Sequence, residues 1–348
     1  MEDKVEDIIE DINLMQGESI AKNKPKRKKS NLGIKITVLI VMLAMAVASF
    51  MVCYQVIIAE AHARYIGIKN VSAEKVSKII RGAEMNANNI FYEVEANMDS
   101  PESVIAALRS KVNLNLDVRG YFAAFVPNYF PEKGIWFEPY IFQPEYGGFE
   151  FRQVGSARHN YTKSSWYIRA QESSHSFWSD PYYYYDGTSL SGHYTTYIKP
   201  IFDAQGNLAC VCGADMKFEW MAKELEWVDN YSRSNKMLNK YQIFDNDDFY
   251  TVILSNDGTC LAHPEGKEMT FKNLDMLKDL QQNKNGVLEM DIDGEACTVY
   301  YGPIEYIDWS VAVIAHKHDI MKPLWPIAII LLSMVAVGMI IVWLVCKR

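Results

Sequence analysis

The sequence predicts an α+β protein whose folded region is held between two transmembrane helices. Two long apolar runs without charge lie near the ends of the 348-residue chain, at 36–58 and 324–346. Between them, helical spacing alternates with short β-branched and aromatic runs bounded by Gly, Pro, Asn and Asp, which is typical of mixed helices and sheets. The chain is 49% apolar, enough for one large or two ordinary domains.

Both apolar runs are long enough to cross a membrane. At about 1.5 Å per residue, each covers a hydrocarbon core of roughly 30 Å. The first follows about thirty polar residues and is too long for the apolar part of a cleaved signal peptide. Trp325 and Trp343 lie near the two ends of the second, where interfacial anchors are expected.

Basic residues set the predicted orientation. They crowd the approach to the first span at 22–35 and follow the second at Lys347-Arg348, so both termini are expected in the cytoplasm. A basic run can also bind nucleic acid, but its position beside a span favours topology. Residues 59–323 then lie outside with 25 basic and 36 acidic side chains, a balance that argues against nucleic acid as a partner.

Helical spacing opens the exterior region. Apolar residues recur three and four positions apart at Val76, Ile79, Ala83, Ala87, Ile90 and Val94. They predict an amphipathic helix that leaves the membrane and ends near Met98. Ser100, Pro101 and Glu102 then supply the cap, first-turn proline and early acid of a second, short helix.

Strand patterns fill the next part of the chain. Runs 120–126 and 135–141 are strand-like, and the Pro-, Gly- and aromatic-rich segment that continues to Tyr161 predicts a long irregular connection. Runs 195–202 and 208–216, joined by a turn cluster, predict a hairpin. The aromatic segment before this hairpin is therefore expected on loops above a sheet, where binding residues concentrate.

A second sheet pattern follows a predicted connector helix that begins at Phe218. The runs FYTVILS and TCLAH flank the turn Asn256-Asp257-Gly258 and predict a hairpin. A short helix at 274–280 and three further strand-like runs, GVLEMDI, EACTVYYGPI and WSVAVIAH, lead to the second span. These elements predict a small α+β module.

Two of the six cysteines lie in the predicted spans, where small apolar side chains are expected. Cys210 and Cys212 point to the same strand face, a spacing unsuited to a zinc knuckle or a disulfide. Cys260 and Cys297 lie in two later strands. A disulfide between them is open if the compartment is oxidising.

This order of parts resembles the double Cache sensor domains of bacterial transmembrane receptors, in which a long helix leaving the first span carries two PAS-like lobes. The resemblance covers nearly all of residues 59–323. Its sequence marks are Trp166-Tyr167, Trp178-Ser-Asp-Pro-Tyr182, Thr195-Thr-Tyr197-x-x-Pro200-Ile201, and Gly206 followed by Gly213-Ala214-Asp215. The aromatic insert GIWFEPYIF looks most like sensors attached to sporulation-type serine phosphatases and some diguanylate cyclases.

The resemblance implies a division of the chain into seven parts. They are a cytoplasmic tail (1–35), a first span (36–58), a long exterior helix (59–98), a membrane-distal Cache lobe (99–217), a connector helix with a membrane-proximal Cache lobe (218–322), a second span (323–346) and the start of the cytoplasmic side (347–348).

The resemblance also implies a ligand in the distal lobe. In amino-acid-binding members an Arg and a Trp hold the ligand carboxylate, and two Asp residues with Tyr groups hold its ammonium. The candidate ligand-binding residues here are Trp166, Tyr167, Tyr182, Tyr184, Asp186 and Asp215.

Two positions depart from the amino-acid motif. Ser164 stands where the Arg belongs, and Tyr184 stands where the first Asp belongs, with Asp186 two residues on. Without a guanidinium, a carboxylate ligand loses a strong charge-assisted pair. The rings with Asp186 or Asp215 instead favour a cation or an amine, at roughly 0.5 to 2 kcal/mol per contact.

Structural roles remain open for the same residues. Tyr and Trp also pack loops onto sheets, and Asp215 stands where it can cap the helix that begins at Phe218. No nucleophile elbow, zinc-protease motif or phosphate loop occurs, so an exterior hydrolase is the least favoured function, and no cofactor is expected. His316-x-His318 is interpreted as a solvated pair and not a metal site.

The favoured function is the extracytoplasmic small-molecule sensing region of a bacterial inner-membrane receptor. The ligand binds in the distal lobe, and the second span passes the signal to a cytoplasmic output module absent from these 348 residues. The long exterior helix predicts a parallel homodimer. The alternative is an exterior partner-binding membrane protein whose output is a separate chain.

Overall fold

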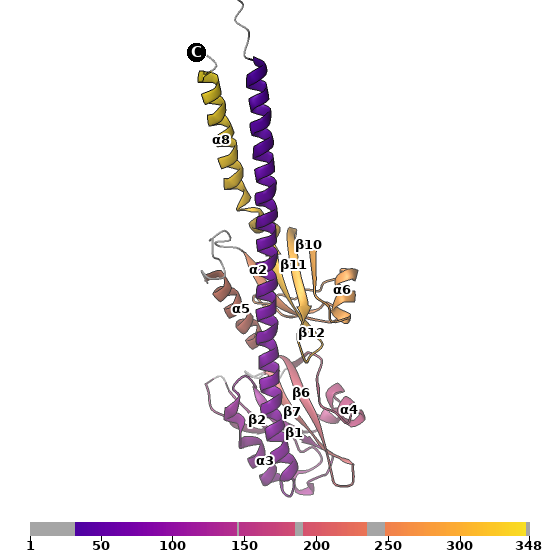
Figure 1. Ribbon diagram of the computed structural model, residues 1–348. Helices are drawn as coiled ribbons and strands as arrows, with labels where there is room; N and C mark the ends of the chain where they lie inside the picture. Colours follow the sequence, from indigo (N-terminus) through magenta and orange to yellow (C-terminus); the bar gives the residue numbers. More distant parts are fainter. Residues whose placement is uncertain (1–31, 145, 185–190, 235–247, 346–348) are drawn as a thin grey trace, which may run out of the picture. The chain divides into compact units, whose positions relative to one another are not determined.

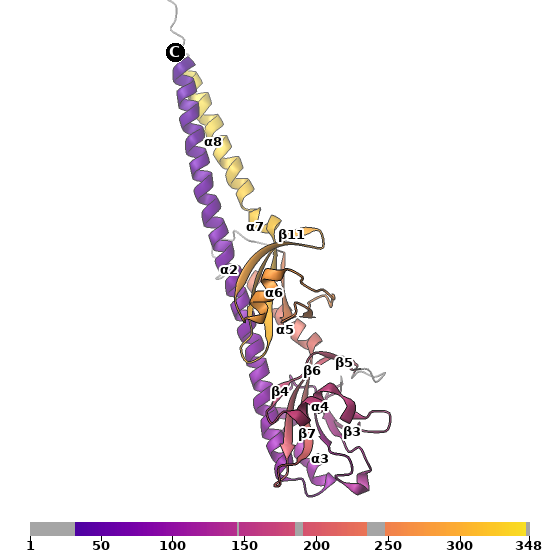
Figure 2. The same cartoon turned by 90° about the vertical axis from the view of Figure 1, so that its right-hand side faces the viewer.

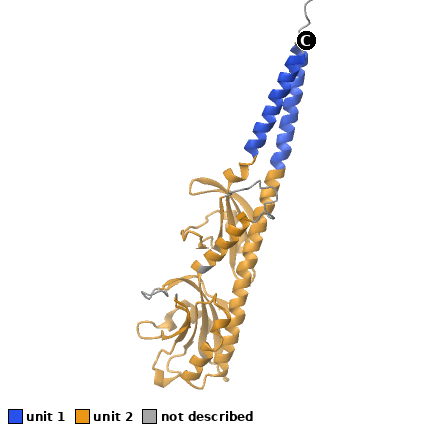
Figure 3. Cartoon of the chain, turned by 90° about the vertical axis from the view of Figure 1, so that its left-hand side faces the viewer, with its two compact units in different colours: residues 1–55, 324–348 blue, residues 56–323 orange. Residues whose placement is uncertain are grey.

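The computed structural model describes residues 32–144, 146–184, 191–234 and 248–345 (Figure 1). It forms two compact units, residues 1–55 with 324–348, and residues 56–323 (Figure 3). Several predicted features lie outside the described residues. They are the basic run before the first span except Lys35, the candidate Asp186, Cys346 and Lys347-Arg348.

Two helices are long and apolar enough to cross a membrane, and they flank the exterior region. The first span and the exterior helix, predicted as separate parts, form one continuous helix, α2 (Leu32–Ala96). The second span is α8 (Leu324–Val345). Within the first unit the two helices approach closely at Gly338, where an added Cβ would meet Met42. Small residues allow this kind of close approach between membrane helices.

The distal lobe is built on a seven-stranded antiparallel sheet of order β3-β2-β1-β7-β6-β4, with β5 also paired to β6. Its strands are β1 (Gly120–Phe125), β2 (Pro139–Phe142), β3 (Glu150–Gln153), β4 (Phe177–Trp178), β5 (Tyr182–Tyr184), β6 (Gly192–Phe202) and β7 (Leu208–Lys217). Its helices are α3 (Pro101–Arg109), capped by Ser100, the short 3-10 helices η1 (Val112–Leu114), η2 (Pro131–Lys133) and η3 (Tyr161–Lys163), and α4 (Ser165–Glu172).

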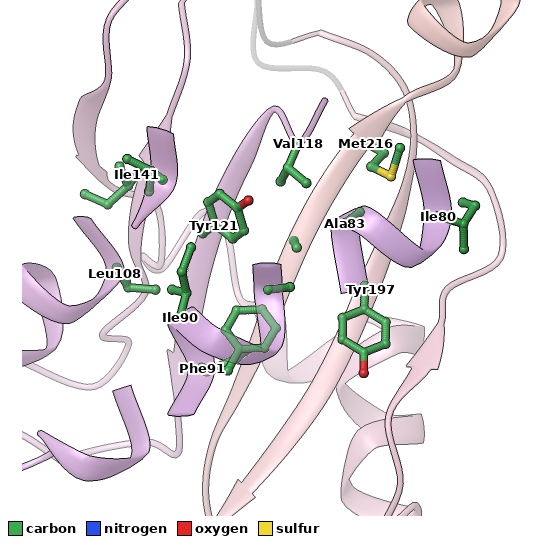
Figure 4. Close-up of a cluster of buried hydrophobic side chains, with 14 of the residues drawn as sticks. Ile80, Ala83, Ile90, Phe91, Leu108, Val118, Tyr121, Ile141, Tyr197 and Met216 are labelled. Atoms are coloured by element: carbon green, nitrogen blue, oxygen red, sulfur yellow. The ribbon is translucent and has the colours of Figure 1, made fainter. Parts of the chain in front are cut away.

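One face of the distal sheet packs on α2. Side chains alternate between the faces of a strand, and alternate residues of β1 and β7, such as Tyr121 and Met216, join Ile80, Ile90 and Phe91 of α2 in one buried cluster (Figure 4). Asn86 Nδ2 donates to Tyr121 Oη at 2.7 Å and fixes the helix against the sheet. The buried apolar residues of α2 in this cluster recur three and four positions apart, as the amphipathic spacing predicted.

The opposite face is covered by α4 and the segment before it (Figure 2). Phe122, Tyr140 and Val211 point to this side and pack with Tyr161 and Tyr167. Since Asp215 follows Val211 by four residues on β7, it faces the same side. The predicted site residue Asp215 therefore lies between this face and the α4 segment.

The proximal lobe carries a five-stranded antiparallel sheet of order β10-β11-β12-β8-β9. Its elements are α5 (Phe218–Ser234), β8 (Phe249–Ser255), β9 (Cys260–Ala262), α6 (Leu274–Gln281), β10 (Gly286–Ile292), β11 (Glu295–Pro303), β12 (Trp309–His316) and α7 (Lys317–Met321). Met276 and Leu280 of α6 cover one face. Tyr65 of α2 packs against Phe249 and Tyr300 on the other.

Three expectations are corrected. The second predicted strand begins at Pro139 and not at Ile135. The supposedly irregular connection contains β3, a short edge strand that its exposed, polar residues concealed. Cys260 and Cys297 are free, because β9 and β11 are separated by two other strands, roughly 14 Å at the usual strand spacing, too far for a disulfide.

Candidate functional site

A cavity lies on the α4 face of the distal sheet. Its volume is about 70 Å³. One water needs roughly 10 to 15 Å³ of such space, so the cavity has room for a ligand of about five heavy atoms. It is lined by Phe122, Glu138, Tyr140, Val154, His159, Trp166, Tyr182, Tyr184, Tyr194 and Asp215.

Two glycines allow the cavity floor to form. Gly213 lies opposite Phe122 in the β1–β7 ladder, and a Cβ on it would come within 2.2 Å of that ring. A Cβ on Gly120 would come within 2.5 Å of the Tyr140 ring. The missing side chains let both aromatic rings lie flat on the sheet, because only glycine leaves the surface above the backbone open.

Asp215 supplies one carboxyl group to the cavity. Its Oδ1 accepts hydrogen bonds from Thr196 Oγ1 at 2.7 Å and from Tyr182 Oη at 3.4 Å. Burial raises its pKa from 3.8 to about 6, and the hydrogen bonds from Thr196, Tyr140 and Tyr182 only partly offset that rise. These donors are all neutral, so the carboxylate has no cationic partner in the cavity lining.

Glu138 supplies a second carboxyl group, just before β2. Its side chain is buried, and its Oε2 has no hydrogen-bond partner among the described residues. The nearest cationic candidate is His159, whose Nε2 lies 3.5 Å from that oxygen without hydrogen-bond geometry. Burial, followed by repulsion from Asp215, raises the pKa of Glu138 well above its usual value, and burial lowers the pKa of His159.

Aromatic rings make the remaining wall. The Trp166 ring packs on Phe122 with centroids 5.2 Å apart, and Tyr182 stacks with Tyr194 at 6.2 Å. Since no Lys or Arg is among the described lining residues, the cavity offers two carboxyl groups and several negative ring faces. Such a site can hold a positive charge by carboxylate contacts and cation–π contacts.

The structure brings together four of the six residues predicted for the site. Trp166, Tyr182, Tyr184 and Asp215 all line the cavity. Tyr167 does not: it is fully buried behind the cavity, 5.4 Å from the ring of Tyr161. Asp186 lies outside the described residues.

Sequence reasoning missed the other lining residues, above all Glu138 and His159. A signal existed, because the acidic residue in GIWFEPYIF is the only charge in a run that is otherwise apolar. Charged groups are rarely buried without a partner unless they have a role. Its neighbours Phe122 and Tyr140 were identifiable only once the strand register was known.

Two alternative roles are also settled. Asp215 does not cap the connector helix, because it lies within β7 and its carboxylate bonds to Thr196. The interpretation of His316-x-His318 as a solvated pair is wrong for His316, whose side chain is only 20% exposed with Nδ1 2.7 Å from Glu295 Oε2, whereas His318 in α7 is exposed. Among the described residues, no group of three His, Cys, Asp or Glu side chains is placed to hold a metal.

Residues 104–223 match the family model described as methyl-accepting chemotaxis protein-like, first PDC sensor domain. This range contains every residue that lines the cavity. The distal lobe is therefore similar to this family of sensor domains over the matched residues. No curated protein matches the chain in sequence.

Solved structures extend the likeness to both lobes. The extracellular domain of the putative histidine kinase soHK1S-Z6 is 19% identical with a TM-score of 0.60, covering 77% of this chain and 98% of its own. The periplasmic sensory domain of the Campylobacter jejuni chemoreceptor Tlp1 is 17% identical with a TM-score of 0.58, covering 74% and 96%. The ligand-binding domain of Mlp24 with asparagine is 13% identical with a TM-score of 0.54, covering 78% and 98%. The exterior region thus has the double Cache fold.

Proposed function

We propose that residues 59–323 are the ligand-sensing region of a bacterial transmembrane receptor, and that a small organic cation binds in the distal cavity. One observation carries the proposal: the cavity joins Asp215 and Glu138 to a wall of aromatic rings, with no Lys or Arg among its described lining residues. A buried ammonium gains about 0.5 to 2 kcal/mol from each aromatic face. It also neutralises carboxyl groups that burial alone leaves costly to ionise.

Signalling needs a ligand that prefers one conformation. A ligand that binds two states with different affinity shifts their populations, and a coupling of about 1 to 3 kcal/mol is typical. The distal lobe runs through α5 into the proximal sheet, whose last strand, β12, continues by α7 into α8. We infer that this order of elements passes the shift to the second span and on to a cytoplasmic output module.

The receptor is proposed to lie in the inner membrane as a parallel homodimer, with both termini in the cytoplasm. The exterior part of α2 supports the dimer, because it exposes the apolar side chains Ile66, Val71, Met85 and Tyr92. Single cysteines at Ile66, Met85 and Tyr92, with Cys53 and Cys260 removed, should crosslink between subunits in membranes. A cysteine at Leu274, which is even more exposed and lies on α6, should not, and failure at all three α2 positions would rule out this seam.

The ligand proposal is tested by thermal unfolding of the full chain in lipid nanodiscs. The panel contains amines, amino acids, organic acids and nucleobases. A ligand at 100 times its dissociation constant adds about 2.7 kcal/mol, which for a domain of this size raises Tm by roughly 5 to 10 °C.

The matched variants are Trp166→Ala in the cavity and Trp227→Ala, an exposed ring on α5. The proposal predicts an amine shift that Trp166→Ala abolishes and Trp227→Ala retains. An organic acid that binds while every amine fails would contradict it.

A further inference from the structure

The buried carboxyl group of Glu138 is the least satisfied polar group in the cavity lining. Only 4% of the residue is exposed, yet Oε2 has no hydrogen-bond partner among the described residues. Buried polar atoms without partners are rare in folded proteins, and each calls for an explanation. Glu138 lines the cavity, so the missing partner is best supplied by a ligand.

The position of Glu138 is held by the fold. Its backbone carbonyl accepts from Val154 N at 3.0 Å, and its Cβ would be 3.0 Å from a Cβ added to Gly155. The side chain is thereby confined between the start of β2 and the segment that follows β3. It cannot swing into solvent without displacing these neighbours, so the carboxyl group stays in the cavity.

The charges around Glu138 are unfavourable to a second anion. The titratable groups that face it are His159 from the segment before η3, Tyr161 from η3, and Asp215 from β7. His159 has its pKa lowered by burial, so it is neutral near pH 7. A ligand carboxylate placed here would meet two acidic groups and no cation, so it would be buried without a counter-ion, and such an unpaired charge is a common means of rejecting a wrong ligand.

We propose that Glu138 is a specificity-determining residue that bonds the ammonium of the ligand and excludes carboxylates, so that the cavity takes compact amines and rejects the corresponding α-amino acids. This inference rests on the proposed function of the cavity. It differs from the arrangement expected for amino-acid sensors, since the described cavity lining holds a second acid and no Lys or Arg.

A proton linkage follows from this arrangement. Burial and the nearby Asp215 both raise the pKa of Glu138, which favours its protonated form in the empty cavity. A bound ammonium favours the ionised form, so amine binding releases a proton and the affinity rises with pH. Replacing the carboxyl group by an amide removes that part of the pH dependence.

The experiment compares amines with their carboxylated counterparts on the full chain in nanodiscs by isothermal titration calorimetry. The pairs are ethylamine and alanine, ethanolamine and serine, isobutylamine and valine, and putrescine and ornithine. In the unmodified protein, the preferred amine should bind at least tenfold more tightly than its amino acid, and more tightly at pH 7.5 than at pH 5.5.

Variants assign the preference to Glu138. Glu138→Gln should reduce the amine preference to less than threefold, whereas Glu138→Asp, which keeps an ionisable carboxyl group, should retain it. Glu172→Gln, exposed on α4, is the matched control and should behave as the unmodified protein. Unchanged Tm values confirm that each variant is folded.

Each outcome has a distinct meaning. An amino acid that binds as tightly as its amine overturns the exclusion of carboxylates but leaves the cavity as a ligand site. An amine preference that survives Glu138→Gln overturns the role of Glu138. If none of the eight compounds binds, the proposed amine function fails, and the inference fails with it.

Discussion

Each lobe of the exterior region buries an aspartate beside its sheet, and the two aspartates are satisfied differently. In the proximal lobe, Asp229 accepts from Thr251 Oγ1 at 2.6 Å and from Thr251 N at 2.8 Å, so each carboxylate oxygen has a partner from β8. In the distal lobe, Asp215 accepts from neutral side chains around a cavity, and Glu138 nearby has an oxygen with no hydrogen-bond partner in the described part of the chain.

The comparison separates a structural acid from a binding acid. Burial raises the pKa of both aspartates to about 6, so the pKa values alone do not tell the two roles apart. Geometry does. Asp229 ties α5 to β8, and both of its oxygens accept from Thr251 although it too borders a cavity, of about 410 Å³. The distal acids border a cavity of about 70 Å³, and Glu138 Oε2 there has no hydrogen-bond partner among the described residues.

The largest expected effect is on the pH dependence of folding. Each aspartate has a pKa of about 6 in the folded protein and 3.8 otherwise, so the folded state binds more protons between these values and stability falls as pH rises from 4 to 6. The difference is worth about 3 kcal/mol per group. Urea unfolding of the unliganded protein at pH 4, 5, 6 and 7 measures it.

Amide variants divide this pH effect between the lobes. Asp215→Asn and Asp229→Asn should each flatten part of the profile, because neither amide titrates. A saturating amine should flatten only the Asp215 part, since it stabilises the ionised acid in the cavity. Equal flattening of both parts by the amine would contradict the division of roles.

A smaller effect is expected when each aspartate is truncated at pH 5, where both carboxyl groups are mostly protonated. Asp229→Ala leaves the buried Thr251 N–H without its acceptor and should cost about 2 kcal/mol. Asp215→Ala should cost under about 1 kcal/mol, because Thr196 Oγ1 and Tyr182 Oη, 2.7 Å apart, can bond each other. Chemical denaturation gives both values. Amine binding should show the reverse order, being lost in Asp215→Ala and retained in Asp229→Ala.

The last effect concerns two glycines that face aromatic rings. A Cβ at Gly213 meets Phe122 in the distal cavity, and a Cβ at Gly286 meets Tyr301 in the proximal lobe. Overpacking of this kind usually costs about 1 to 3 kcal/mol, and a ring that can tilt into the cavity should put Gly213→Ala near the lower end. Only Gly213→Ala should weaken amine binding, as titration of both variants would show. Weakened binding in Gly286→Ala alone would place the ligand elsewhere.

Much of the fold was predictable because its signals are local. The spacing of Val76, Ile90 and Val94 predicted the half of α2 that belongs to the exterior region, and the β6–β7 hairpin followed from its turn residues. The edge strand β3 was not predictable, since an edge strand needs few apolar residues and its sequence, EFRQ, has none of the usual alternation. The separation of Cys260 and Cys297 depended on strand order, which the sequence pattern does not carry.

The candidate site was predictable only in part. Trp166, Tyr182 and Asp215 lie in a recognisable motif, and they do meet at one cavity. Glu138 and His159 lie on segments whose approach to that cavity depends on the pairing of β2 with β1 and β3. Tyr167 was grouped with the site because it adjoins Trp166, but in a helix adjacent residues point in different directions. The contrast shows that motif adjacency identified the region, whereas register identified the contacts.

The central claim is that the ligand binds in the distal lobe and not in the proximal one. The most direct test is hydrogen–deuterium exchange of the full chain in nanodiscs, with and without the amine that gives the largest rise in Tm. We expect the amine to slow the exchange of backbone amides in β1, β7 and α4, and to leave the exchange of β8, which contacts Asp229, unchanged. Protection concentrated in β8 to β12, with the distal strands unchanged, would contradict it.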